Sequence, residues 1–238
     1  QYNQPFFIKD DPICIPHLFT KQQDQEIAGF FAAMFAWGNR TTIIQKSRQL
    51  MELMNMAPHA FCLHHNSDGL KRLLEFKHRT FNPTDLLYFI EFLKHHFSKH
   101  DSLVTAFTMH GDTIEDMLTG FHHYFFSLED APLRTRKHIS TPGNNSSCKR
   151  LNMFLRWMVR RDDRGVDLGL WRSISPSKLI CPIDVHVMRV ATELRLIDRN
   201  KADWKSAVEL TDRLREFDNE DPAKYDFALF TLGAEERF

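Results

Sequence analysis

The feature that most constrains the fold is the spacing of the apolar side chains. Phe, Leu and Met recur at intervals of three and four residues along most of the chain, whereas alternating runs of Val, Ile and Thr are nearly absent. Recurrence at about 3.6 residues is typical of amphipathic helices, and alternation is typical of strands. Only 9 Gly and 10 Pro interrupt the 238 residues. The sequence therefore predicts an all-α protein.

Polar residues ahead of the apolar stretches indicate where helices begin. We expect Thr41 or Thr42 to cap one helix, Asp112 to open another with Glu115 three residues later, and Ser146 or Ser147 to cap a third. The pair Gly38–Asn39 should end the first long helix, because both residues tolerate a left-handed backbone. The predicted helices cover residues 24–37, 43–54, 67–77, 83–96, 102–108, 113–126, 148–160, 184–196, 202–217 and 222–232.

Bulk charge and cysteine content exclude several classes of protein. Lys plus Arg and Asp plus Glu both number 31, so the chain does not coat nucleic acid by net charge. The four cysteines are far apart, which favours reduced thiols in a cytoplasmic protein and argues against an iron–sulfur cluster. Of the 13 histidines, only His96 and His100 have a helical i,i+4 spacing, so we expect no metal site. The longest apolar run, residues 27–37, is too short to span a membrane.

One segment departs from this neutrality. Residues 131–165 contain nine basic and two acidic residues, a net charge of +7. Such a run is often only a solvated surface. Here it surrounds a Pro-Gly loop that opens a helix, and backbone N–H groups at a helix start together with basic side chains bind phosphate.

Two motifs within and after this segment carry the chemistry. The first, Pro142-Gly143-Asn144-Asn145-Ser146-Ser147-Cys148-Lys149-Arg150, places a lysine in the first turn of a helix. The helix dipole disfavours a cation there, and hence favours the neutral amine that a nucleophilic lysine needs. The alternative is a lysine that contacts phosphate or solvent. The second motif, Pro182-Ile183-Asp184-Val185-His186-Val187-Met188-Arg189, places Asp184 at an N-cap, where most aspartates are only caps.

The second motif resembles the Pro-Val-Asp-Thr/Val-His-x-x-Arg signature of the helix-hairpin-helix DNA glycosylases, which include endonuclease III and the 8-oxoguanine glycosylases. The likeness extends over roughly residues 20–235 and is greatest to a bacterial branch related to the archaeal 8-oxoguanine glycosylases. It implies two helical lobes, one of residues 28–130 and one of residues 1–27 plus 131–238. The hairpin would lie at the cleft between them.

The resemblance also implies roles for individual residues. Asp184 matches the catalytic aspartate and Lys149 the lysine that forms a Schiff base, so the two should approach within several ångström. Asn39 matches the residue that enters the space left by a flipped base, and Arg40 a contact to the opposite base. Residues implied to hold DNA phosphates are Gly143, Asn145, Ser147, Arg150, Arg134, Arg136 and Lys137. Candidates for the base pocket are Cys148, Phe154, His186 and Phe230, although aromatic residues at helical spacing usually belong to the core.

The function implied is base excision from double-stranded DNA by a monomeric enzyme associated with the nucleoid, without a cofactor and with AP-lyase activity if the lysine attacks. The sequence departs from the family in two ways: the hairpin has one glycine instead of Gly-x-Gly, and 35 positions separate Lys149 from Asp184. Two alternatives stay open. One is a helix-hairpin-helix protein that binds DNA without cutting it, and the other is a helical protein with a small-molecule or protein ligand.

Overall fold

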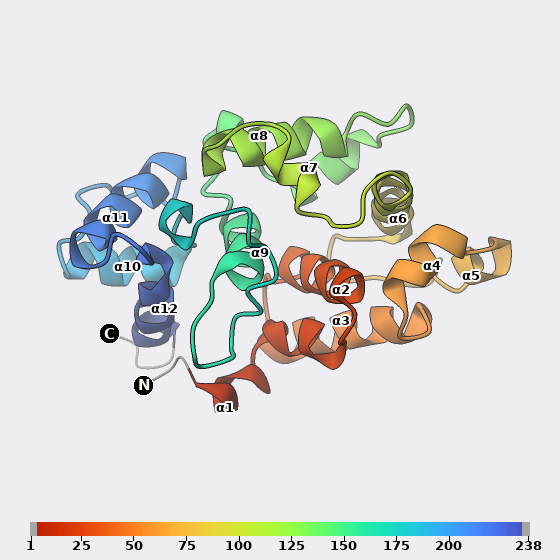
Figure 1. Cartoon of the computed structure of the whole chain (residues 1–238), viewed down its shortest axis with the longest axis horizontal. Helices are drawn as coiled ribbons and strands as arrows, with labels where there is room; N and C mark the ends of the chain where they lie inside the picture. Colours follow the sequence, from red (N-terminus) through yellow and green to blue (C-terminus); the bar gives the residue numbers. More distant parts are fainter. Residues whose placement is uncertain (1–3, 235–238) are drawn as a thin grey trace. The chain divides into compact units, whose positions relative to one another are not determined.

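The computed structural model describes residues 4–234, and it is built from helices joined by turns and loops (Figure 1). No strand occurs within these residues, where the only β-type pairings are two isolated bridges, His78 with Phe81 and Ser146 with Asp203. The all-α prediction is confirmed. No helix among the described residues has both the length and the apolar character needed to cross a membrane. The α-helices are α1 (Pro5–Ile8), α2 (Gln22–Met34), α3 (Arg40–Leu53), α4 (Pro58–His64), α5 (Ser67–Lys71), α6 (Pro83–Phe97), α7 (Thr105–Thr108), α8 (Ile114–Phe125), α9 (Lys149–Val159), α10 (Val185–Glu193), α11 (Trp204–Phe217) and α12 (Asp226–Ala234). The 3₁₀ helices are η1 (Pro12–Cys14), η2 (Pro16–Leu18), η3 (Leu133–His138), η4 (Pro142–Asn144), η5 (Pro176–Lys178) and η6 (Pro222–Tyr225).

The chain divides into two compact units. One, here called the N-terminal unit, consists of residues 9–110 and 120–139, and the other, the C-terminal unit, of residues 1–8, 111–119 and 140–238. The division falls inside α8, so this helix belongs partly to each unit. Lys149 and Asp184 lie in the same unit, whereas Asn39, Arg40 and the η3 basic residues belong to the N-terminal unit.

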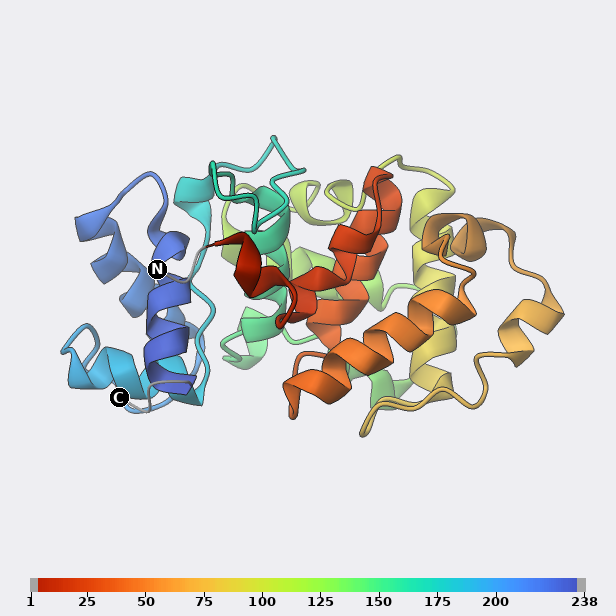
Figure 2. The ribbon, with the colours of Figure 1, turned by 90° about the horizontal axis from the view of Figure 1, so that it is seen from below.

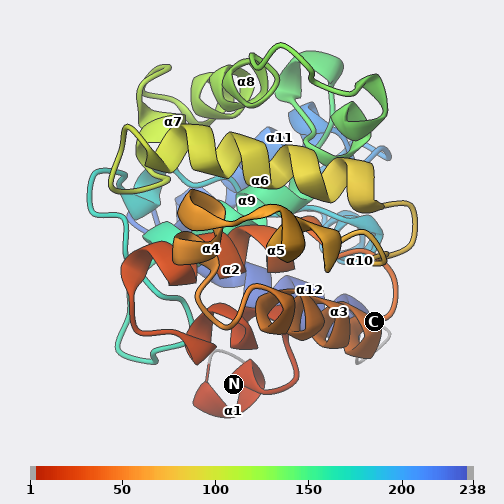
Figure 3. The same ribbon diagram turned by 90° about the vertical axis from the view of Figure 1, so that its right-hand side faces the viewer.

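The core of the N-terminal unit is a cluster of phenylalanines around α2. From Ile27 to Phe35 every residue of this segment is at most 1% exposed or a buried glycine, as the apolar run predicted. Helices α3 and α4 pack on α2, and α4 also packs on the long helix α6 (Figures 2 and 3). Ring centroids of Phe92 and Phe125 are 4.4 Å apart, and those of Phe107 and Phe121 are 4.2 Å apart. Burial of such large rings is the main stabilising term of this unit.

The C-terminal unit is organised around α9 and the pair α10–α12. Leu151, Phe154, Leu155 and Met158 of α9 are at most 1% exposed. Helix α10 packs against α12 at very short range, because a Cβ added to Gly233 would lie 2.7 Å from the carbonyl oxygen of His186. Helix α11 packs against η6, which leads directly into α12.

Three predicted helix starts are wrong. Asn39, not Thr41 or Thr42, caps α3: its side chain accepts a hydrogen bond from Thr42 N at 3.0 Å. Helix α8 begins at Ile114, and the side chains of Thr113 and Asp116 bond each other at its start, one position later than the predicted pair of Asp112 and Glu115. The third error is the start of α9, where Cys148 and not Ser146 or Ser147 is the N-cap residue. The prediction that Gly38–Asn39 ends the first long helix is also wrong: α2 ends at Met34 with Phe35 as its C-cap, and Asn39 is extended, although Gly38 does have a positive φ of +97°.

Helix lengths differ from the predictions where tertiary contacts override local spacing. The stretch 67–77 is helical only to Lys71, 102–108 only from Thr105, and α4 was not predicted. The expected loop 129–147 contains the short helices η3 and η4.

Candidate functional site

Asp184 divides its two carboxylate oxygens between two partners. It caps α10, as predicted, because Oδ1 accepts hydrogen bonds from His186 N at 2.9 Å and Val187 N at 3.1 Å. The other oxygen, Oδ2, lies 3.5 Å from Nζ of Lys149. The predicted approach of the amine and the carboxylate is therefore confirmed as a distance within the C-terminal unit.

Lys149 is the first residue of α9, and two residues shortly before it have a left-handed backbone conformation. Asn145 has φ +53° and Cys148 has φ +50°, and Cys148 is the N-cap residue without a side-chain cap. The predicted cap by Ser146 or Ser147 is wrong, because both hydroxyls are used elsewhere. Ser146 Oγ accepts from Cys148 N at 3.2 Å, and Ser147 Oγ donates to Ile183 O at 3.2 Å.

These hydrogen bonds explain why two residues distant in sequence meet. The Ser147 hydroxyl holds the loop before α9 against Ile183, the residue immediately before Asp184. One turn into α9, Asn152 Nδ2 donates to Ser147 O at 3.0 Å and fixes the same loop from the other side. Lys149 and Asp184 are thus each one or two residues from a common anchor, which sets their separation.

The pair is accessible. The side chain of Lys149 is 25% exposed and that of Asp184 is 21% exposed, so a molecule arriving from solvent can reach both. The amine lies 5.8 Å from the ring centroid of Phe230 on α12, which covers one side of it. An aromatic face next to an ammonium stabilises the cation modestly. The arrangement combines an amine, a carboxylate and an aromatic surface.

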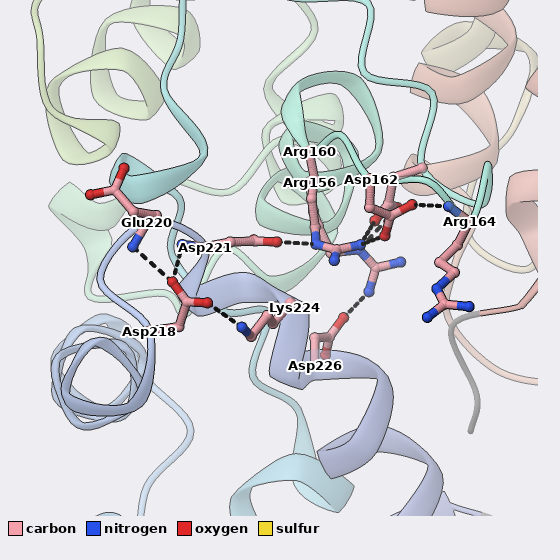
Figure 4. Close-up of polar contacts among 10 residues, drawn as sticks. Arg156, Arg160, Asp162, Arg164, Asp218, Glu220, Asp221, Lys224 and Asp226 are labelled. Carbon is pink, nitrogen blue, oxygen red and sulfur yellow. Dashed lines mark hydrogen bonds and ion pairs between the residues drawn. The ribbon is translucent and has the colours of Figure 1, made fainter.

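A network of buried charges lies further along α9, and the sequence analysis missed it. Arg156 contacts Asp226 of α12 and donates through Nε to Asp167 Oδ1 at 3.3 Å (Figure 4). Arg160 bonds Asp167 at 3.0 Å and Asp221 at 2.9 Å. Burial raises the pKa of Asp226 to about 6, and the charges of Arg156 and Lys149 offset part of that effect. Arg156 within an otherwise apolar helical stripe was the available signal, because a buried arginine requires a partner.

The loop between η4 and α9, residues 145–148, is held by the residue that precedes α11. Asn145 Nδ2 donates to Asp203 Oδ2 at 3.2 Å, and Ser146 forms an isolated bridge with the same residue. Burial alone would raise the pKa of Asp203. Hydrogen bonds from Ser206 N and from the Arg199 guanidinium outweigh that effect and lower the pKa to about 2. Gly143 is exposed and has no left-handed φ, and a Cβ there would meet only Thr141 Oγ1 at 3.6 Å. The fold of the C-terminal unit does not require a glycine at this position.

The other pocket candidates differ in burial. Phe154 is fully buried and packs edge-on against Trp171, with ring centroids 5.3 Å apart, so it is a core residue. Cys148 is 1% exposed, and burial raises the pKa of its thiol to about 11. His186 is partly buried, and its Nδ1 has no hydrogen-bond partner among the described residues. Arg150, the second residue of α9, is half-buried.

The remaining predicted DNA contacts lie in the N-terminal unit. In η3, Arg134 donates to Thr80 O at 2.9 Å and lies 3.3 Å from the buried Asp85 carboxylate. Arg136 covers the ring of Phe126 at 5.1 Å, and Lys137 is exposed. Asn39 uses its side-chain oxygen to cap α3, whose first residue is Arg40.

Within residues 4–234, no group of three or more His, Cys, Asp or Glu side chains is arranged to hold a metal ion.

Comparison with known proteins gives a family but no named relative. No curated protein and no solved structure matches the chain. A family model does match, over residues 11–235. The chain belongs to the family described as protein of unknown function DUF2400.

Proposed function

We propose that the protein is a DNA glycosylase with AP-lyase activity, in which Lys149 is the nucleophile and Asp184 the catalytic carboxylate. One observation carries the proposal: Lys149 Nζ and Asp184 Oδ2, 35 positions apart in sequence, lie 3.5 Å apart with both side chains partly exposed. The Pro182–Arg189 motif that resembles the glycosylase signature supplies Asp184 of this pair.

The chemistry follows from the division of the Asp184 oxygens. Oδ1 is occupied by backbone N–H groups, so Oδ2 is the oxygen available to the amine. The ammonium gives a proton to Asp184 Oδ2, the nearest acceptor, and the neutral amine attacks C1′ of the sugar. The C1′–N bond breaks, its electron pair leaves with the nucleobase, and the proton on Oδ2 passes to the nucleobase, so that the carboxylate is ionised again and stabilises the positive charge at the sugar. The nitrogen now bonded to C1′ loses a proton, through Oδ2, to the ring oxygen as the C1′–O4′ bond breaks, which gives the protonated Schiff base. Removal of the C2′ proton by Oδ2 breaks the C3′–O bond, and the 3′ phosphate leaves with that electron pair.

The proposed substrate is double-stranded DNA with one nucleotide turned out of the stack. Unstacking costs a few kcal/mol and is easiest at a lesion or mismatch. The exposed hairpin around Gly143 would contact the backbone beside that nucleotide, because a glycine that the fold does not require leaves space for a phosphate to approach. Phosphate contacts also predict that binding weakens steeply with salt.

Borohydride trapping tests the proposal. Duplexes that carry an oxidised purine, or an abasic site, are incubated with the protein and borohydride, and a covalent adduct is scored on a denaturing gel. We expect an adduct with the native chain, none with Lys149→Gln, and an unchanged yield with Lys205→Gln, an exposed lysine on α11. Asp184→Asn should keep the helix cap, since Asn is an equally good N-cap, while the yield falls by about 100-fold or more.

The same experiment separates the alternatives. Salt-sensitive binding to duplex DNA without an adduct on either substrate would replace the enzyme with a non-cutting DNA-binding protein. An adduct that persists in Lys149→Gln would refute the assignment of the nucleophile. Absence of any binding to DNA would refute the proposed substrate.

A further inference from the structure

Charged groups of α9 contact α12 at two places along the helix. Near its start, the Lys149 amine lies 5.8 Å from the Phe230 ring, and further along, the Arg156 guanidinium contacts the Asp226 carboxylate. Lys149 and Arg156 are seven residues apart and so share a face of α9, and Asp226 and Phe230 are four apart and share a face of α12. The contacts run in opposite order along the two helices, so α12 is antiparallel to α9 along this face.

The Arg156–Asp226 contact is a firm attachment rather than a surface ion pair. The two side chains are only 6% and 8% exposed. Arg156 is held on its other side by Asp167, which is fully buried, and its guanidinium lies 4.3 Å from the Phe227 ring centroid. In Figure 4, Asp226 points from the first turn of α12 directly to Arg156. Removing one partner of such a pair leaves a buried charge without compensation, which is strongly destabilising.

We propose that Asp226 is a positioning residue for the Lys149 site: through Arg156 it fixes α12 so that Phe230 covers the amine, and it places a second carboxylate behind that amine. The inference rests on the proposed function, because it gives the pair a role in preparing the nucleophile. From the helical rise, one turn of α12 separates Asp226 from Phe230, about 6 Å along the axis. The carboxylate is therefore within electrostatic range of the amine without touching it.

The electrostatic consequence has a definite sign. The charged groups that act on Asp226 come from three directions: Arg156 and Lys149 of α9, Asp184 at the start of α10, and Asp167 of the loop after α9. Ionised Asp226 attracts the Lys149 ammonium and helps to hold it in place beside Phe230. Asp226→Asn removes that attraction.

The experiment observes Lys149 directly and needs no DNA. Lysines of the full chain are reductively methylated with ¹³C-formaldehyde, and the Lys149 signal is identified by its absence in Lys149→Gln. Its chemical shift reports the position of the amine against the Phe230 ring. We expect Asp226→Asn to move the signal away from its native position, and Asp226→Glu to return it towards that position.

Asp218→Asn is the matched control. Asp218 also pairs with a cation, Lys224 of η6. Its other hydrogen bonds come from the backbone N–H groups of Glu220 and Asp221, which lie outside α9. The Asp218→Asn change should leave the Lys149 signal unchanged. The native chain gives an independent measurement if Asp226→Asn does not fold: the Lys149 signal should move as Asp226 titrates, near the pKa of Asp226, about 6. An Asp226→Asn protein with a native Lys149 shift, or a native chain whose Lys149 signal does not move near pH 6, would overturn the inference.

Trapping adds a functional readout that a purely structural role would not move. If Asp226 acts as inferred, adduct formation by the native chain should change as Asp226 ionises near pH 6, and Asp226→Asn should lack that change. A general loss of folded protein would lower the yield equally at every pH. If no adduct forms with the native chain, the proposed function fails, and the NMR result on Lys149 still decides whether Asp226 positions the amine.

Discussion

Gly233 is the position where a single methyl group should do the most damage to the site. In the native structure a Cβ at this residue would lie 2.7 Å from His186 O and 3.0 Å from its carbonyl carbon, whereas ordinary contact begins at 3.4 Å. The obstacle is backbone, so no side-chain rotation relieves it. In Gly233→Ala, α12 must therefore move away from α10 by about 0.7 Å or distort.

The magnitude follows from three terms. Overpacking of this kind costs about 1–3 kcal/mol. Displacement weakens the hydrogen bond from Arg189 Nη2 to Gly233 O, 2.6 Å long, which is worth about 1 kcal/mol. The better helix propensity of alanine returns up to about 1 kcal/mol. We expect the free energy of unfolding to fall by about 1–3 kcal/mol, and Tm by about 3–8 °C for a chain of this size.

Thermal unfolding followed by tryptophan fluorescence reports the unfolding of the C-terminal unit, because Trp157, Trp171 and Trp204 lie in that unit. Gly143→Ala is the control: its Cβ meets only Thr141 Oγ1 at 3.6 Å, so Tm should change by less than about 1 °C. Equal melting temperatures for Gly233→Ala and the native chain would refute the close approach of α10 and α12. In the expected case the trapping yield should also fall, since α12 carries Phe230.

Three further predictions concern titratable groups. The lowered pKa of Asp203, about 2, means that its contribution to stability is present above about pH 4 and is lost as the pH falls towards 2, so the urea midpoint of Asp203→Asn should differ most from native near neutral pH. Burial lowers the pKa of His96 to about 4, so the folded state holds it neutral. The stability that His96 contributes is fully present above pH 6.5 and falls between pH 6.5 and 4, and His96→Gln should flatten that dependence in circular dichroism melts; a His96→Gln curve parallel to native would contradict it. Burial raises the pKa of the Cys148 thiol to about 11, so it should react with a disulfide reagent at pH 8 only after urea unfolds the chain, and labelling of the native chain within seconds would show that the thiol is exposed.

Most of the helices were predictable because they follow from local spacing. The run around Phe30 and Phe31 is buried on every side, and such a run indicates a central helix. The Asp184 cap was equally local, since its side chain bonds N–H groups only two and three residues ahead. Local rules are sufficient where the partner of a side chain lies within the same turn.

The errors arise where a side chain has a distant partner. Ser147 was expected to cap α9, but its hydroxyl reaches Ile183, 36 residues away, and the backbone enters the helix through a left-handed Cys148 instead. The charge network of Arg156 connects residues 70 positions apart, so no local pattern identifies Asp226 as its partner. For the Lys149–Asp184 pair, a family resemblance supplied the long-range information that spacing alone lacks.

The two duties of Asp184 have a consequence for how relatives of this chain should be compared. Its Oδ1 starts α10 and its Oδ2 faces the amine, so an aspartate at this position would be retained for architecture even in a protein that has lost all reactivity. Lys149 has no such second duty, since a cation at the beginning of a helix is unfavourable to that helix. If the proposed reaction takes place, a relative that lacks it would be free to lose the lysine first, and the residue at position 149 would be the better indicator of which relatives share the reaction.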